Sequence, residues 1–389
     1  MAKTIKKQQK SSKTASAAAA RRSQSVKKSQ PTVMPKVSII VTCYKGGEFL
    51  PRCLKSLTEQ TLKEIEIICV NDGSPDNTRE VLEEWSQKDA RVRAIHNPTN
   101  VGVSAARNIG LQAARAEFVT FCDADDYKDP TFCAQMLEAM TTQGVDLTIC
   151  GTRIIYEAHP EMKFSDDNYY SLKYSGRQTV NEDLILNVDL APSNKLFRRA
   201  VIEHVGLRFP EGLYYEDAYF CVAYLCAVRK VYFLNRSLQF YVRHENSTMS
   251  NTWSGDKSKD HAIDHLYVAF RLYDFLRERR LLARWENLYW RVFIVFGYFA
   301  IENSKSRARI RQVKREAAEF VRQHQESLAR AESYVQEEVK LMVSQRLSLN
   351  PTRLKRRLLP FMPTYKLQNL NIQRLRWLKN EMEKMANEE

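Results

Sequence analysis

Three carboxylates stand within four positions at the end of an apolar run. Residues 118–122 are typical of a buried strand, and Asp123, Asp125 and Asp126 follow them directly. Acids this close together repel one another unless a cation lies among them, so the cluster could hold a divalent metal ion. The alternative is a polar turn that caps a helix near Pro130, because Asp is common in turns and at helix N-termini. The cluster alone does not decide between the two.

The segments before this cluster alternate between strand and helix. Short apolar, β-branched runs predict strands at residues 37–44, 65–70, 92–95 and 118–122. Apolar residues at helical spacing lie between them, which predicts an α/β fold: a Rossmann-like, mostly parallel sheet with helices on both faces. Ligands of such sheets bind beyond the carboxyl ends of the strands, so the polar residues at those ends should converge on one crevice.

The first strand is not followed by a glycine-rich phosphate loop. The sequence has neither G-x-G-x-x-G there nor G-x-x-x-x-G-K-[ST], so a dinucleotide oxidoreductase and a P-loop nucleotidase lose their main support. The phosphates of a ligand would then be neutralised by a divalent cation on the acids and by Arg107.

Several ordered motifs resemble one known family, the family-2 inverting glycosyltransferases with the nucleotide-sugar-binding GT-A fold. The resemblance is close from about residue 37 to residue 140, looser to about residue 250, and absent from the tail and the C-terminal region. The matching segments are residues 37–44, Asn71-Asp72-Gly73-Ser74, residues 100–110, residues 121–126 and Tyr215-Glu216-Asp217-Ala218.

The resemblance implies a donor site at the first two strand ends. Thr42, Cys43, Tyr44 and Asp72 would bind the nucleotide base, and Arg107 would lie near the diphosphate or the ribose. The alternative for Asp72 is a turn that caps the next helix, and for Arg107 a salt bridge on a helix surface.

The D-x-D motif of the family matches Asp123, Ala124 and Asp125. By this resemblance Asp125 would bind Mn²⁺ or Mg²⁺ on the diphosphate oxygens, and Asp123 would contact the ribose, the metal or the sugar. Asp126 would only cap the following turn.

The resemblance also implies a catalytic base. Asp217 would take the proton of the acceptor hydroxyl, and Glu216 would orient it, contact the acceptor, or act as the base itself. An ordinary carboxylate is ionised at neutral pH and can accept a proton. The alternative is a helix N-terminus in which two acids favour the helix dipole.

Two further segments resemble the acceptor side of bacterial polysaccharide and lipopolysaccharide transferases. Asn194 and Lys195 would touch sugar hydroxyls or phosphate. His244, in a segment that resembles the closing loop of the family, would be a metal or phosphate ligand. The alternative for His244 is an ordinary loop residue.

Charge and periodicity divide the 389-residue chain into three regions. Residues 1–34 carry nine Lys or Arg and no acid, and we expect a disordered basic tail. Residues 35–255 would form the GT-A domain, and residues 256–389 a helical C-terminal region. Residues 353–362 mix cations with large apolar residues, which would suit an anionic membrane surface; the alternative is a solvated helix packed through its leucines.

The eight cysteines include no C-x-x-C pair, and several lie in apolar runs, which indicates buried reduced thiols. No signal peptide or membrane-spanning run is evident. We expect a cytoplasmic protein with peripheral contact to the inner face of the plasma membrane.

The sequence thus predicts an inverting, metal-dependent glycosyltransferase. The donor would be a nucleotide sugar, most simply a UDP-sugar, and the acceptor a saccharide or lipid-linked glycan of the cell envelope; no nucleic-acid partner is expected. The alternatives are a catalytically silent sugar-nucleotide or glycan-binding protein and a nucleotidyltransferase.

Overall fold

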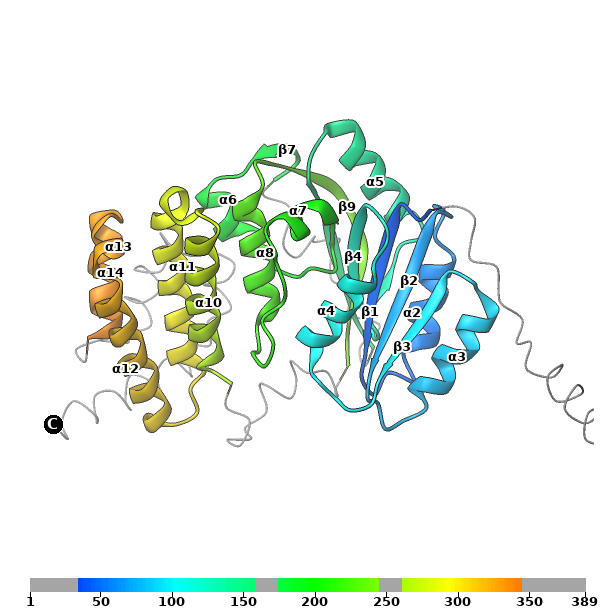
Figure 1. The fold of residues 1–389 in the computed structure, drawn as a ribbon, viewed down its shortest axis with the longest axis horizontal. Helices are drawn as coiled ribbons and strands as arrows, with labels where there is room; N and C mark the ends of the chain where they lie inside the picture. Colours follow the sequence, from blue (N-terminus) through cyan, green and yellow to red (C-terminus); the bar gives the residue numbers. More distant parts are fainter. Residues whose placement is uncertain (1–33, 158–173, 245–260, 345–389) are drawn as a thin grey trace, which may run out of the picture. The chain divides into compact units, whose positions relative to one another are not determined.

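The four predicted strands of the first half form, and they run parallel. The structure is a computed structural model that describes residues 34–157, 174–244 and 261–344. In this half the strands are β1 Val37–Cys43, β2 Ile65–Asp72, β3 Val92–Asn97 and β4 Phe118–Asp123. The helices between them are α2 Leu50–Thr58, α3 Thr78–Lys88 and α4 Val103–Ala113 (Figure 1).

The second half of the sheet mixes strand directions. Over the described residues the sheet order is β3-β2-β1-β4-β8-β6-β9-β5, with β7 paired to β9. β8 is antiparallel to both β4 and β6, whereas β6 and β9 are parallel. These strands are β5 Tyr127–Lys128, β6 Leu147–Tyr156, β7 Gly176–Thr179, β8 Lys195–Arg198 and β9 Lys230–Arg243. Their helices are α5 Phe132–Gln143, α6 Glu182–Asn187, α7 Arg199–His204 and α8 Glu216–Ala227.

Helices cover both faces of the sheet, as predicted. Alternate side chains of a strand point to opposite faces, so Ile39 and Ile40 of β1 enter different cores. Ile39 packs with α2 and α5, whereas Ile40 packs with α4 and α8. The predicted α/β architecture is confirmed.

The predicted C-terminal helical region is also confirmed. Its helices are α10 Asp264–Glu278, α11 Leu282–Asn303, α12 Arg307–Gln323, α13 Gln325–Ala329 and α14 Ser333–Val343. None of the helices in the described ranges is long and apolar enough to cross a membrane. The basic tail and residues 353–362, with the roles predicted for them, lie outside the described residues.

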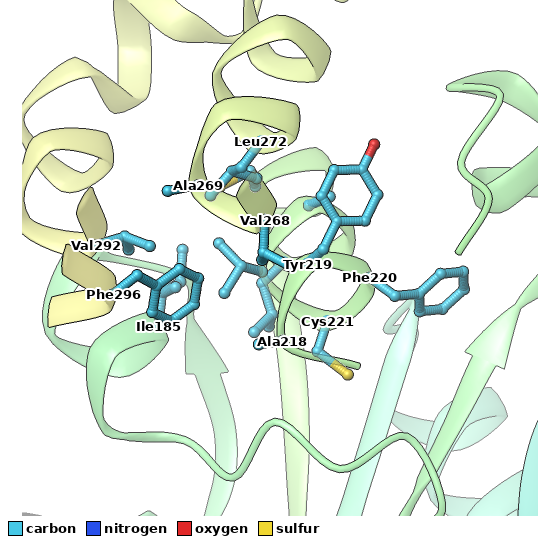
Figure 2. Packing of buried hydrophobic residues seen from close by; sticks show 14 of the residues in the cluster. Ile185, Ala218, Tyr219, Phe220, Cys221, Val268, Ala269, Leu272, Val292 and Phe296 are labelled. Atoms are coloured by element: carbon cyan, nitrogen blue, oxygen red, sulfur yellow. The ribbon is translucent and has the colours of Figure 1, made fainter. Parts of the chain in front are cut away.

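One hydrophobic core joins the helical region to the sheet. Figure 2 shows α8 side chains such as Ala218 beside Val268 of α10 and Phe296 of α11. Trp285 of α11 donates a hydrogen bond from Nε1 to the Cys226 carbonyl at the end of α8, at 2.9 Å. The predicted boundary near residue 256 therefore separates two parts of the chain that share one core.

All eight cysteines are free and buried. The predicted reduced, interior thiols are confirmed. The sulfur atoms of Cys53 and Cys122 lie 3.8 Å apart, and both thiols are within reach of the Asp123 carbonyl.

Candidate active site

The carboxyl ends of β1, β2 and β4 bring the predicted donor residues together. Thr42 is in register with Asp123 on the neighbouring strand, and its Oγ1 donates to Asp123 Oδ1 at 3.3 Å. Cys43 is buried, and burial is the main cause that raises the pKa of its thiol. The nearby Cys69 raises this pKa further. Tyr44 is 49% exposed at the end of the strand. The Tyr44 ring is thus open to a ligand, whereas the Cys43 thiol is not.

Asp72 builds the loop before α4. Its Oδ1 accepts from Asn97 Nδ2 and the Val101 amide, both at 2.9 Å, and its Oδ2 accepts from the Gly102 amide at 2.8 Å. The side chain is buried. Both oxygens are thus bonded within the protein, so this arrangement does not support the predicted contact to a nucleotide base. The three hydrogen bonds of Asp72 go to the last residue of β3 and to residues after it, and not to the start of α3, the helix that follows Asp72 in the sequence. The alternative of a turn that caps this helix therefore does not describe Asp72 either.

The D-x-D turn directs its residues to different neighbours. Asp123 ends β4 and faces Thr42. Ala124 is buried against Gly46, where an added Cβ would lie only 3.1 Å from the Ala124 Cβ. Asp125 Oδ2 lies 3.0 Å from His244 Nε2 at the end of β9. Burial raises the pKa of Asp125, and Asp123 raises it further, while the hydrogen bond to His244 opposes both.

Asp126 does more than cap the following turn. It is buried, and its oxygens accept from Gln239 Nε2 at 3.1 Å and from the Val242 amide at 2.9 Å, both on β9. Burial raises its pKa well above the ordinary value, and Asp123 and Asp125 add to this. The capping prediction is corrected: Asp126 fastens the turn to β9 because that strand supplies the donors.

His244 is placed against the D-x-D turn, as its predicted role requires. Its ring stacks on Phe49 with the centroids 4.5 Å apart. Phe49 and Arg52 flank the start of α2, and Arg52 donates from Nη2 to the Asp125 carbonyl oxygen at 2.9 Å. These two residues carried no motif, and no sequence feature singled them out.

Arg107 joins the two acidic motifs. Its guanidinium donates to Asp123 Oδ1 at 3.0 Å and to Glu216 Oε1 at 2.5 Å, and it lies over the Phe209 ring at 5.3 Å. The group is buried. Burial alone would lower the pKa of Arg107, but the carboxylates of Asp123 and Glu216 outweigh it and raise the pKa. A surface salt bridge is therefore excluded for Arg107.

Glu216 and Asp217 occupy the first turn of α8. Both the predicted acidic pair and its alternative, a helix N-terminus, describe this position. Glu216 is buried and held by Arg107, whereas Asp217 is half-buried. Burial and the charge of Glu216 raise the pKa of Asp217 to about 7, against the opposing effect of Arg107. The carboxyl is thus poised between its two forms near neutral pH, rather than fully ionised as predicted.

Asn194 and Lys195 lie inside the protein. Neither side chain has any exposed surface. Asn194 donates to the Cys150 carbonyl and to Asp189, both at 3.0 Å, and the Lys195 ammonium donates to the Asp189 carbonyl at 2.6 Å and to Asn194 Oδ1 at 2.8 Å. They hold the loop before β8, so this arrangement does not support the predicted contact to an acceptor.

The described residues contain no cluster of three or more His, Cys, Asp or Glu arranged to hold a metal ion. Two possible ligands, Asp125 and His244, face each other. Asp123 lies near enough to raise the pKa of Asp125. Mg²⁺ and Mn²⁺ suit such a set, since one or two carboxylates together with substrate phosphates are common ligands. The residues thus fit a cation that a bound diphosphate helps to hold.

The architecture of the sheet defines the class of protein. Residues 1–349 of S. aureus TarS, solved in complex with UDP-GlcNAc, share the fold with a TM-score of 0.58 at 18% identity, over 90% of this chain and 92% of that one. The fold is GT-A, as predicted.

The sequence of the same region resembles a known family. Residues 38–206 match the family described as glycosyl transferase family 2. This match covers less than half of the chain and agrees with the resemblance of its motifs. Asp72, Arg107, Asp123 and Asp125 lie inside the matched range, whereas Asp217 lies outside it.

Curated relatives match over part of their length. The putative glycosyltransferase EpsH of Bacillus subtilis is 34% identical over 226 residues, which cover 55% of this chain and 62% of the relative. The cholesterol galactosyltransferase of Borreliella burgdorferi is 26% identical over 275 residues, which cover 68% of this chain and 74% of the relative. The match thus spans less than two thirds of EpsH.

Proposed function

We propose that the protein transfers a sugar from a nucleoside diphosphate donor, most simply UDP, to a hydroxyl of a saccharide or lipid-linked acceptor in cell-envelope glycan synthesis. The observation that carries this proposal is the Arg107 bridge. One buried cation contacts Asp123 at 3.0 Å and Glu216 at 2.5 Å, so the acids assigned to the donor and those assigned to the acceptor proton lie at one place.

The D-x-D side binds the donor. Asp125, with Asp123 and His244 beside it, would hold Mn²⁺ or Mg²⁺ and the donor diphosphate. When bound, the metal ion would stabilise the charge that develops on the departing nucleoside diphosphate. The fold is shared with TarS, which was solved with UDP-GlcNAc, and this supports the choice of a UDP-sugar.

The α8 side handles the acceptor proton. Asp217 accepts the proton from the attacking hydroxyl, and its pKa of about 7 suits a base that works near neutral pH. Glu216 is held by Arg107, so we assign it the orienting role and not that of the base. The C–O bond to the diphosphate breaks as the bond to the acceptor oxygen forms, and this single displacement inverts the anomeric carbon.

A panel of nucleotide sugars with Mn²⁺ tests the proposal. We expect release of nucleoside diphosphate from one donor, loss of turnover with retained donor binding in Asp217→Asn, and loss of metal-dependent donor binding in Asp125→Ala. Wild-type turnover in both variants would contradict the mechanism. Donor binding without turnover in the wild type would indicate a silent binding protein, and pyrophosphate release from a nucleoside triphosphate would indicate a nucleotidyltransferase.

A further inference from the structure

The residue before the acidic pair has an unusual backbone. Tyr215 has φ 66° and ψ 28°, in the left-handed region. This conformation is unfavourable for a residue with a bulky side chain and persists only where the surroundings hold it. The turn that leads into Glu216 and Asp217 is therefore maintained by contacts from elsewhere in the chain.

Those contacts come from the start of α10, here meaning residues 261–265. The Tyr215 ring stacks on His265 with the centroids 3.5 Å apart, and the Tyr214 ring stacks on His261 at 3.8 Å. The Tyr214 amide donates to Asp264 Oδ2 at 3.2 Å. Two ring stacks and one backbone hydrogen bond thus hold two consecutive residues.

The His265 ring acts as an aromatic surface. It is buried, and burial lowers its pKa to about 3, so the ring is neutral at physiological pH. Its Nδ1 lies 3.3 Å from the Ala262 carbonyl, which can only accept, so the ring donates there and stays fixed to its own helix.

The rest of α10 packs along α8. Val268 and Leu272 of α10 lie in the same core as Ala218 and Tyr219 of α8 (Figure 2). The start of α10 and the first turn of α8 are therefore joined through a packed interface as well as through the ring stacks.

We propose that the start of α10 positions the catalytic base of the GT-A domain by holding Tyr214 and Tyr215 in this turn. The inference rests on the proposed function, in which Asp217 is the base. His261, Asp264 and His265 are positioning residues, since they act through the turn. The helical region thereby supports the catalytic centre from outside it.

The chemistry explains why such support matters. A base must lie within hydrogen-bond reach of the proton it removes, and a displacement of about 1 Å can cost about a hundredfold in rate. The donor residues lie on β1 and α4, at the end of β4 and in the turn after it, and after β9, all outside this turn. Loss of the support should therefore lower kcat and leave donor affinity unchanged.

Three variants test this. His265→Ala removes the ring under Tyr215, and we expect kcat to fall about tenfold to a hundredfold with the donor KM unchanged. His265→Phe keeps an aromatic ring at a site that is already neutral, and should restore kcat to within about threefold of the wild type. His324→Ala is the matched control, because His324 stacks on Phe320 within the helical region. It should lower stability without changing kcat.

A second measurement does not depend on catalysis. Hydrogen exchange of the amides at residues 213–218 should become faster in His265→Ala and stay slow in His265→Phe. Should His265→Ala fail to fold, Asp264→Ala, which removes the bond to the Tyr214 amide, takes its place with the same expectation.

The outcomes separate the two proposals. Unchanged exchange at residues 213–218 in the Ala variant, or an equal loss of kcat in His324→Ala, would overturn the positioning role. Absence of turnover in the wild type with every donor would overturn the proposed function, and the exchange measurement would still decide whether the start of α10 holds the turn.

Discussion

At the residue scale the site depends on one shared cation. Arg107 pairs with Asp123 at the end of β4, 16 residues away, and with Glu216 at the start of α8, 109 residues away. A buried charge is costly without a partner, so the guanidinium and the buried Glu216 side chain compensate each other, while Asp123 keeps part of its surface exposed. Arg107 therefore both joins β4 to α8 and balances the charge of the two acids.

Arg107→Gln should be strongly destabilising. It leaves the buried Glu216 carboxylate without its cation, and breaking a buried pair in this way costs about 3–5 kcal/mol. Chemical denaturation measures the loss. Arg93→Gln is the control, because its partner Glu66 keeps a second cation, Arg115, and the cost should stay below about 1 kcal/mol. Equal unfolding midpoints for the two variants would contradict this view of the bridge.

The acceptor reaction should weaken in acid. Asp217 must be ionised to accept a proton, and its pKa is about 7, so kcat/KM should fall about tenfold for each pH unit below that value. Arg107 lowers this pKa, so any Arg107→Gln protein that folds should show the acidic limb at higher pH. A flat kcat/KM profile down to about pH 5 would argue against Asp217 as the base.

At the element scale, the close approach of α4 to β1 places Arg107. A Cβ on Gly110 would come within 2.3 Å of Ile40 Cγ2, so α4 can lie this near the sheet only with glycine at that position. The helix carries Arg107 one turn earlier, on the same side as Gly110 and Ala106.

Gly110→Ala should therefore lower both the melting temperature and activity, although alanine favours a helix by about 1 kcal/mol. The clash is with a core side chain of β1, so the helix must move outward and take Arg107 with it. Gly297→Ala in α11 is the matched control, since its Cβ would meet the flexible end of Met342. We expect that variant to be tolerated. Equal effects of Gly110→Ala and Gly297→Ala would contradict the view that α4 packs too closely on β1 to accept a Cβ at residue 110.

At the scale of the whole molecule, the sheet and the helical region share a core. The buried face of α8 lies in one core with α10 and α11. At the C-terminal end of α8, Trp285 of α11 donates a hydrogen bond to the Cys226 carbonyl. A chain that ends at residue 255 would expose this face to water.

Such a truncated chain should not fold cooperatively. Exposure of the α8 side chains removes apolar burial worth about 25 cal/mol per Å², which a single domain of marginal stability cannot lose over a whole helix. Expression in the soluble fraction and thermal unfolding would measure this, with the full chain as the reference. A sharp unfolding transition in the fragment would show that the GT-A domain is self-sufficient.

Much of the architecture could be predicted from local patterns, because strand runs, helical spacing and the D-x-D motif are short-range features. The β4 strand was predicted to within one residue. The contacts that fix the site are long-range: Asp126 to Val242, Arg107 to Glu216, and Tyr215 to His265. No pattern within one segment contains them. The burial of Asn194 and Lys195 could not be predicted for the same reason, since it depends on β6 and on Asp189.

The left-handed turn at Tyr215 limits where this chain can be joined to a relative in a chimaeric protein. A chimaera that exchanges the helical region, in the hope of changing acceptor choice, would separate Tyr214 and Tyr215 from the rings they stack on. The crossover must therefore lie on the C-terminal side of His265, or residues 214–215 and 261–265 must be exchanged together as one inherited unit.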